Sequence, residues 1–416
     1  MTKIAMPGNV RFILDMLYRA GYEAYIVGGC VRDSIIGKEP HDWDICTSAT
    51  PEQIIQVFNH YKIIPTGLKH GTVTIVKNNK QYEITTYRID GEYEDARHPK
   101  DVRFTTSLSD DLSRRDFTIN AMAYNDRDGV IDIFGGIEDI NDKVIRCVGD
   151  AEERFSEDAL RIMRAIRFAI RYGFDIEEQT FIAMLHKVKL LDKISAERIN
   201  SELTQIIMGE SSILAMMLCK AEKIFTYLFP QLKDVSSPYI NNIMHSEPVK
   251  EVRLALLFDL PREELRNALS SLRYDNDTIS NVLQIRTYGQ MAIYDLKENE
   301  SIRCFVKRMM RDIGYQNTLN ALSYSVAYSM AKSNENAVNL YKNMQNIAME
   351  VEYKNECYKL SQLALNGNDI KRFGYKGKEI GVVLQYLLEM VIKEVLENKR
   401  NVLEKRVEEI SGLQKM

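Results

Sequence analysis

The stretch Glu23-Ala-Tyr-Ile-Val-Gly-Gly-Cys-Val-Arg-Asp33 decides how this chain folds. Residues 23–27 have the pattern of a short apolar strand, and residues 31–37 have that of a helix. Glycines between a strand and a helix let the backbone approach a phosphate, and the helix start presents free N–H groups beside the cation of Arg32. Taken alone, Gly28-Gly29 is more often a simple tight turn.

Two carboxylates follow closely, in His41-Asp42-Trp43-Asp44-Ile45. If residues 43–46 form a strand, its alternation turns Asp42 and Asp44 to one face. Mg²⁺ prefers oxygen ligands and keeps water and substrate phosphates in its shell, so it needs only two or three such groups. Glu83, an acid inside a strand-like run, is a third candidate. The D-x-D pattern alone is as often a turn or a helix cap, but its conjunction with a phosphate-binding turn is much rarer.

The remaining pattern predicts an α+β head followed by an all-helical body. Further strand candidates are residues 43–47, 71–76 and 82–88, and almost all β signal ends by residue 145. Long amphipathic helices are expected at residues 151–171, 177–191, 196–208 and 212–229, and onward to the C-terminus. Only 21 Gly and 9 Pro occur among 416 residues, which also favours helix.

Composition excludes several classes of protein. A hydrophobic fraction of 45% with 27% charged residues rules out disordered and collagen-like chains, and the net charge of -4 shows no global basic field. The six scattered cysteines include no C-x-x-C pair, which argues against a zinc site or a disulfide framework. With no apolar run near the roughly 18 residues of a membrane span and no signal-like segment, we expect a cytoplasmic protein without membrane contact.

Two arginine-rich motifs could bind a nucleotide. Arg114-Arg115-Asp116 precedes an apolar stretch expected to be helical, and arginines suit triphosphate oxygens while Asp116 could accept from a ribose hydroxyl. Ordinary capping of a helix start is the alternative.

In the helix expected at residues 151–171, an apolar stripe lies opposite a charged side. That side carries Asp158, Arg161, Arg164 and Arg171, with Arg167 at its edge. A solvated charged face is the usual explanation, but the guanidinium fork suits base edges and phosphates. An acid and an arginine one turn apart could present an acceptor and donors to a nucleobase.

These motifs together resemble the class II CCA-adding tRNA nucleotidyltransferases. The resemblance rests on five motifs in order, which are Gly28-Gly-Cys-Val-Arg-Asp33, Asp42-Trp-Asp44, Arg114-Arg-Asp116, Glu157-Asp-Ala-Leu-Arg161 and Glu197-Arg-Ile-Asn-Ser-Glu202. It is dense over the first 210 residues and returns at residues 366–370 and 373–381.

The resemblance implies a polymerase-β-like nucleotidyltransferase head at residues 1–145, a neck at 146–210, a helical body at 211–331 and a helical tail at 332–416 that binds tRNA. It implies that CCA is added to the 3′ end of tRNA from CTP and ATP without a nucleic-acid template. In that reaction the tRNA 3′-hydroxyl attacks the α-phosphate of the nucleotide, pyrophosphate leaves, and Mg²⁺ is the cofactor.

The resemblance also implies the site residues. Asp42 and Asp44 would bind Mg²⁺, and Glu83 would be a third catalytic carboxylate. Asp158 and Arg161 would select CTP or ATP by hydrogen bonds, and residues 197–202 would brace the neck. The other nucleotide-binding residues implied are Gly29, Arg32, Arg115, Asp116, Arg164 and Arg167.

The tail offers a basic turn. Lys376 and Lys378 lie near Gly374 and Gly377, at the start of a helix expected at residues 379–393. Backbone N–H groups and lysines there could clamp tRNA phosphates. A helix–helix turn with solvated lysines explains the pattern about as well.

Other functions stay open at this point. Bacterial poly(A) polymerases share the head motifs, although residues 66–74 and a pI of about 6.0 favour CCA addition. CC-adding enzymes tend to lack a loop that this chain keeps at residues 90–108, and A-adding enzymes remain the chief alternative. A catalytically silent RNA-binding protein would need none of the motif aspartates. The sequence is compatible with a homodimer and does not define the oligomeric state.

Overall fold

The computed structural model of this chain describes residues 3–68, 71–91, 102–230, 242–258, 260–291 and 301–413. These residues form two compact units. One comprises Met1–Ile206 and Lys223–Phe229, and the other comprises Ile207–Glu222 and Pro230–Met416.

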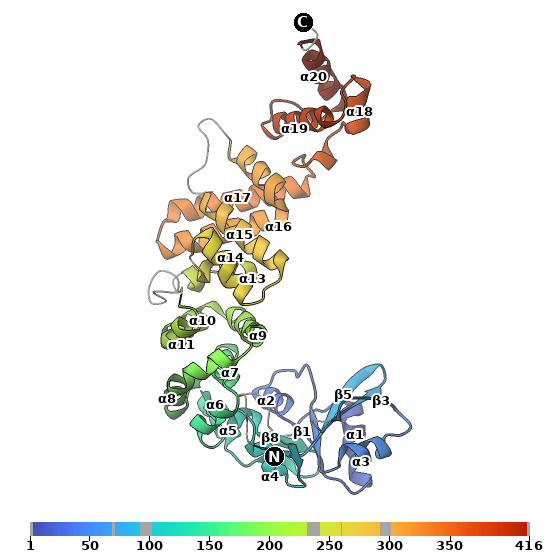
Figure 1. The fold of residues 1–416 in the computed structure, drawn as a ribbon, viewed down its shortest axis with the longest axis vertical. Coiled ribbons are helices and arrows are strands. Elements are labelled where there is room, and N and C mark those ends of the chain that lie inside the picture. The colour runs from blue at the N-terminus through green and yellow to red at the C-terminus, as the bar shows by residue number, and fades with distance from the viewer. Residues whose placement is uncertain are drawn as a thin grey trace. The chain divides into compact units, whose positions relative to one another are not determined.

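The first unit is built on a mixed sheet (Figure 1). Within the described residues, its strand order is β3-β4-β5-β2-β1-β8-β9. Its neighbouring strands pair antiparallel except β2 and β5, which run parallel. The strands are β1 (Ala24–Val27), β2 (Ile45–Thr47), β3 (Lys62–Gly67), β4 (Thr72–Lys77), β5 (Lys80–Thr86), β8 (Met122–Asn125) and β9 (Gly129–Asp132). Two short pairs lie outside this sheet, β6 (Arg88–Asp90) with β7 (Val102–Phe104) and β10 (Val144–Ile145) with β11 (Asp175–Ile176).

Helices surround this sheet and continue beyond it. They are α1 (Gly8–Arg19), α2 (Gly29–Ile36), α3 (Pro51–Val57), α4 (Leu108–Ser113), α5 (Gly136–Asp142), α6 (Ala151–Glu157), α7 (Leu160–Tyr172), α8 (Glu178–Lys187) and α9 (Ala196–Ile207). An apolar cluster that includes Tyr25, Cys46 and Ala123 joins β1, β2 and β8 to α4. It fixes the strand ends that carry the site residues.

The second unit is helical throughout its described residues. Its main helices are α10 (Ser211–Lys220), α13 (Lys250–Leu257), α14 (Arg262–Ser271), α15 (Asn276–Met291), α16 (Ile302–Ala331), α17 (Glu335–Tyr353), α18 (Gly367–Arg372), α19 (Lys378–Ile392) and α20 (Arg400–Leu413). The helix α11 (Glu222–Leu228) follows α10 in sequence but belongs to the first unit apart from its first residue. One apolar core joins α16 to α17, and a separate one joins α18, α19 and α20.

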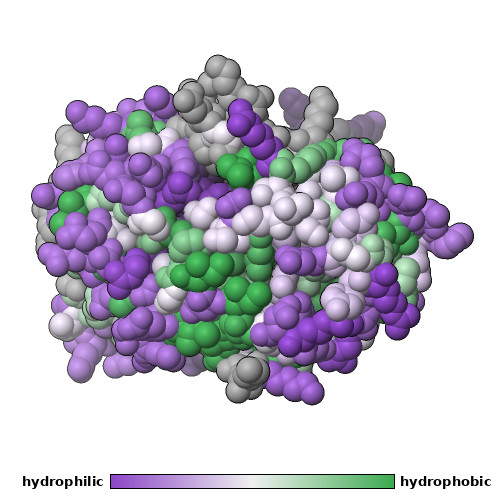
Figure 2. All heavy atoms as spheres, turned by 90° about the horizontal axis from the view of Figure 1, so that it is seen from below, coloured by the Kyte–Doolittle hydropathy of each residue, from purple (hydrophilic) through white to green (hydrophobic). Residues whose placement is uncertain are grey.

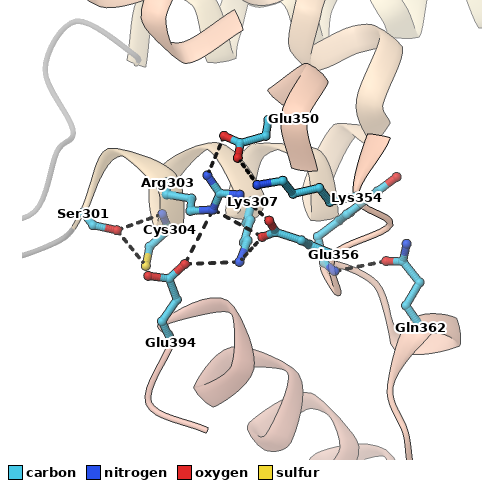
Figure 3. Close-up of polar contacts among 10 residues, drawn as sticks. Ser301, Arg303, Cys304, Lys307, Glu350, Lys354, Glu356, Gln362 and Glu394 are labelled. Atoms are coloured by element: carbon cyan, nitrogen blue, oxygen red, sulfur yellow. Dashed lines mark hydrogen bonds and ion pairs between the residues drawn. The ribbon is translucent and has the colours of Figure 1, made fainter. Parts of the chain in front are cut away.

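A charged network connects these two cores (Figure 3). Arg303 on α16 pairs with Glu350 of α17 at 3.0 Å and with Glu356 just beyond it. Lys307 pairs with Glu356 at 2.8 Å and with Glu394, which follows α19, at 3.3 Å. The hydrogen bond to Glu356 is the main cause that raises the pKa of Arg303 above its ordinary value.

Several expected elements differ in their limits. The strand expected at residues 43–47 begins only at Ile45, so Trp43 and both motif aspartates precede it. The helix expected at 151–171 is two helices with an extended residue, Asp158, between them. The stretch after Asp116 was expected to be helical and is instead a 3₁₀ turn, Thr118–Asn120, followed by β8.

Figure 2 shows one face of the protein on which hydrophobic residues form a central area bordered by hydrophilic ones. Exposed apolar side chains of the first unit include Tyr18, Ile89, Phe104 and Ile133. Exposed apolar side chains are normal on protein surfaces, and we assign these no role. None of the described helices is both long enough and apolar enough to cross a membrane.

Candidate active site

The turn from β1 to α2 is tightly packed at Gly28. Gly28 has φ 76 and ψ -125, a conformation that side chains disfavour, and a Cβ there would lie 2.9 Å from Nη1 of Arg115. Its N–H donates to the carbonyl of Met122 at 3.1 Å, which ties the turn to β8. Gly29 opens α2. Glycine is therefore required at position 28, and the simple-turn interpretation does not account for the nearby guanidinium.

Arg32 lies on the first turn of α2 and is buried. Its Nε donates to Oδ1 of Asp33 at 2.9 Å, and its Nη1 donates to Oδ1 of Asn120. The sequence identified Arg32 but not Asn120 as a site residue. Asn120 follows the Arg114-Arg115-Asp116 motif by four residues, which is the only sequence signal that could have pointed to it.

Asp42 and Asp44 lie on the segment that leads into β2. The carbonyl of Asp44 accepts from the N–H of Val27 at 3.0 Å, so this segment is held against the end of β1. Partial loss of hydration raises the pKa of Asp44, Asp42 adds to the rise, and Arg115 opposes it. The charge of Asp42 therefore acts on Asp44.

Glu83 is exposed on β5, and the parallel register that pairs Ile45 with Ile84 places it beside Asp44 in the next row of the sheet. However, no group of three or more His, Cys, Asp and Glu side chains in the described residues could hold a metal ion. The role expected for Glu83 as a third catalytic carboxylate stays a prediction, as does metal binding by Asp42 and Asp44.

Asp111 holds both arginines of the motif that follows α4. This buried carboxylate accepts from Arg114 at 2.7 Å and from Nη2 of Arg115 at 3.1 Å. Burial alone would raise the pKa of Asp111, but Arg115 and Arg114 outweigh it and the net shift is downward. In the described part of the chain, the buried Nε of Arg115 has no hydrogen-bond partner. Such an orphaned donor is costly unless a ligand accepts from it, which fits a phosphate oxygen.

Asp116 is buried, and its carboxylate is saturated with donors. Oδ1 accepts from the Phe117 N–H and from Asn120, both at 2.9 Å, and Oδ2 accepts two bonds from Arg164 at 2.9 and 2.7 Å. Burial alone would raise the pKa of Asp116, but Arg164, Asn120 and Arg161 together hold that pKa well below its ordinary range. A carboxylate has about four acceptor positions. A ribose hydroxyl could therefore bind to Asp116 only after displacing one of these donors.

The proposed base-selecting pair lies at the break between α6 and α7. The Asp158 carboxylate accepts from the N–H of Leu160 at 3.1 Å and from Arg198 of α9 at 2.7 Å. Arg161 donates to Glu157 at 2.7 Å and to the carbonyl of Arg114 at 2.9 Å. Each member of the pair is thus held by its own partners. Arg198 was missed as a site residue, although it lies inside the motif at residues 197–202.

Burial bears on the alternative explanation of the charged side of α7. Arg161 and Arg167 are buried, so a solvated face does not explain these two arginines. Nε of Arg167 donates to Oε2 of Glu202 on α9 at 2.6 Å, and Arg164 lies 3.9 Å from the same carboxylate. Residues 197–202 therefore contact the α7 arginines directly.

In the tail, Lys376 and Lys378 are exposed at the start of α19. Gly374 and Gly377 both have positive φ, at 96 and 54. The Glu379 carboxylate accepts from the N–H of Lys376 at 3.0 Å, so an acid already occupies one N–H of the expected clamp. The lysine side chains remain available to a phosphate.

The sequence of this chain matches known protein families along most of its length. Family models match the chain at residues 24–146 (Poly A polymerase head domain), 173–235 (an RNA and SrmB-binding site of polymerase A) and 244–407 (tRNA nucleotidyltransferase domain 2). The CCA-adding enzyme of Limosilactobacillus reuteri (strain DSM 20016) is 36% identical over 409 residues, with 96% of each chain covered. The chain belongs to the CCA-adding enzyme family.

Other members of the CCA-adding enzyme family agree in sequence and fold. The enzyme of Enterococcus faecalis is 34% identical over 402 residues, covering 92% of this chain and 91% of its own. The crystal structure of the Bacillus stearothermophilus CCA-adding enzyme in complex with CTP superposes with a TM-score of 0.78 at 28% identity, covering 99% of both chains. The expected α+β, polymerase-β-like head with a helical remainder is confirmed, and family membership makes the chain a nucleotidyltransferase of a kind that uses a divalent metal.

Proposed function

We propose that this chain adds CCA to the 3′ end of tRNA, using CTP and ATP without a nucleic-acid template. The observation that carries the proposal is the 36% identity to a CCA-adding enzyme along 96% of both chains. The site supports it, because buried arginines surround a glycine turn beside two carboxylates.

Asp42 and Asp44 would hold Mg²⁺. Two carboxylates separated by one residue on the segment that leads into β2 offer the hard oxygen donors that this ion prefers, and it takes its remaining ligands from water and nucleotide phosphates. When bound, the ion would lower the charge on the reacting phosphate and favour ionisation of the tRNA 3′-hydroxyl. Glu83, which the pairing of β2 with β5 places beside Asp44, would be the third catalytic carboxylate.

The side chains position the nucleotide rather than react with it. Arg32, Gly29 and the free Nε of Arg115 would bind the triphosphate. Asp116 would act mainly by orienting Arg164, whose guanidinium it holds by two bonds. Asp158 and Arg161 would select the base by hydrogen bonds, which requires that some of the bonds from Arg198 to Asp158 and from Arg161 to Glu157 break. In the tail, Lys376 and Lys378 would bind tRNA phosphates.

The test is incorporation of labelled CTP and ATP into tRNAs that end before, within or after the CC of the 3′ terminus. Full CCA addition predicts two C and one A on the shortest tRNA, with pyrophosphate released. Addition of A alone, and only after CC, would identify an A-adding enzyme, and a long run of A would identify a poly(A) polymerase.

Asp42→Ala should abolish incorporation and leave tRNA binding nearly unchanged. Asp142→Ala, a change at an exposed aspartate at the end of α5, is the matched control and should keep full activity. Loss of tRNA binding and activity together in Asp42→Ala would contradict a purely metal-binding role for Asp42.

A further inference from the structure

Phe168 on α7 lies among three guanidinium groups. The Cζ atoms of Arg32, Arg164 and Arg167 lie 5.1, 5.3 and 4.2 Å from its ring centroid. All three are within the roughly 6 Å over which a cation is attracted to an aromatic face. Phe168 is only 4% exposed, so water screens these contacts weakly. A single ring thus contacts three arginines of the proposed nucleotide site.

Tyr172, one helical turn later, holds one of these arginines from another side. Its ring stacks on Phe168 with centroids 6.1 Å apart and planes at 20°. Cζ of Arg32 lies 4.8 Å from the Tyr172 centroid, so Arg32 contacts both rings. Lys38 at 4.8 Å and Arg171 at 5.6 Å also approach the Tyr172 ring.

The polar end of Tyr172 acts on the same arginine. Its hydroxyl donates to Oδ1 of Asp33 at 2.8 Å, and this oxygen also accepts from Nε of Arg32 at 2.9 Å. Arg32 has five N–H donors, of which the contacts to Asp33 and Asn120 use three. Its orientation is therefore fixed by two rings and two polar partners, while donors remain for a phosphate.

The three arginines are matched by carboxylates outside the rings, since Arg32 pairs with Asp33, Arg164 with Asp116, and Arg167 with Glu202. The rings add an attraction that does not occupy N–H donors, because the ring face attracts the guanidinium plane. A leucine of similar volume would fill the space but would not hold the guanidinium groups at a fixed angle.

We propose that Phe168 and Tyr172 form an aromatic pair that positions Arg32, and through Phe168 also Arg164, to bind the nucleotide triphosphate. Both are positioning residues that act through the arginines. The inference rests on the proposed nucleotide site and adds two residues that no sequence motif indicated. Because the phosphates are common to CTP and ATP, the pair should set affinity for both nucleotides and leave the choice between them unchanged.

The test compares Phe168→Leu, Tyr172→Leu and Tyr172→Phe in the full chain. Each leucine variant should raise the KM for CTP and for ATP about 5- to 30-fold, with a smaller fall in kcat and an unchanged KM for tRNA. Tyr172→Phe keeps the ring and loses the hydroxyl, so it should recover most of the affinity. Phe168→Tyr, which keeps an aromatic face, should likewise recover most of it.

A binding readout separates positioning from structural damage. CTP binding without tRNA should weaken in the leucine variants, whereas binding of cytidine, which has no phosphate, should not change. Phe155→Leu is the matched control, because Phe155 is fully buried in α6 and lies outside the aromatic pair. It should lower thermal stability by a similar amount with normal CTP affinity.

Two results would overturn the inference. One is normal CTP affinity in Phe168→Leu and Tyr172→Leu, and the other is a loss of affinity for cytidine equal to that for CTP. If the parent chain adds CCA while the variants give either result, the inference fails alone. If the parent chain does not add CCA, the proposed function fails, and CTP binding by the variants still tests the aromatic pair.

Discussion

The ion pair between Arg167 and Glu202 allows a sharp test of how the α7 arginines are held. Their side chains are 8% and 7% exposed, and Nε lies 2.6 Å from Oε2. Replacing Glu202 with leucine would leave a buried guanidinium without its carboxylate, which costs about 3–5 kcal/mol. Because Arg167 keeps its contact with Phe168 at 4.2 Å, we expect a loss in the free energy of unfolding at the lower end of this range, about 3 kcal/mol.

For a unit of this size, about 3 kcal/mol corresponds to a fall in Tm of roughly 6–12 °C. Differential scanning calorimetry of the full chain should show this fall in the transition of the first unit. The double variant Glu202→Leu/Arg167→Met removes both charges and should recover most of the stability, because apolar side chains can replace a buried pair at little cost.

The same double variant separates folding from nucleotide binding. If Arg167 serves the nucleotide, the double variant should be stable yet have a raised KM for CTP and ATP. A shift in Tm below about 2 °C in Glu202→Leu, or a double variant no more stable than the single one, would refute the assignment of this pair as a buried, coupled ion pair.

Three further predictions follow from the site and the tail. Arg161→Ala should blur the discrimination between CTP and ATP before it destroys incorporation, and a nucleotide-competition assay with unchanged selectivity would count against its role. The pKa of Asp111 is lowered on folding, so its stabilising contribution is complete above the ordinary value of about 4 and is lost as the pH falls through the lower folded value. Asp111→Asn should therefore lower Tm at pH 7, and its difference from the parent should shrink toward about pH 3; a constant difference would contradict this. Reversing the charges of Lys376 and Lys378 to glutamate should raise the KM for tRNA and flatten its dependence on salt, whereas Lys405→Glu in the same tail should do neither.

Features of the fold that depend on residues close together in the chain could be predicted from the sequence. The strand before Gly28 and the helix after it were both legible from local pattern and turn residues. The hold of Asp111 on Arg114 and Arg115 was also legible in principle, because the residues are three and four apart on one helical turn. This spacing was not used to predict the site, so Asp111 was not among the expected site residues.

The missed features depend on residues that are distant in the chain. Nothing local indicates that Glu202 meets Arg167 across 35 positions, or that Arg164 meets Asp116 across 48. Periodicity therefore placed the arginines of α7 on one charged side but could not indicate the carboxylates from other segments that pair with Arg164 and Arg167. The break at Asp158 was hidden because the apolar repeat continues on either side of it, while its carboxylate accepts the N–H of Leu160.

The network of Figure 3 has a consequence for measuring how the tail meets RNA. The apolar cores on either side of it are separate, and Arg303 and Lys307 pair with Glu356 and Glu394 between them. Added salt would weaken these partly exposed pairs at the same time as it competes for phosphates. The slope of tRNA affinity against salt would then overcount the phosphates that the protein contacts. A count of RNA contacts in this enzyme should therefore be taken from lysine substitutions at fixed ionic strength.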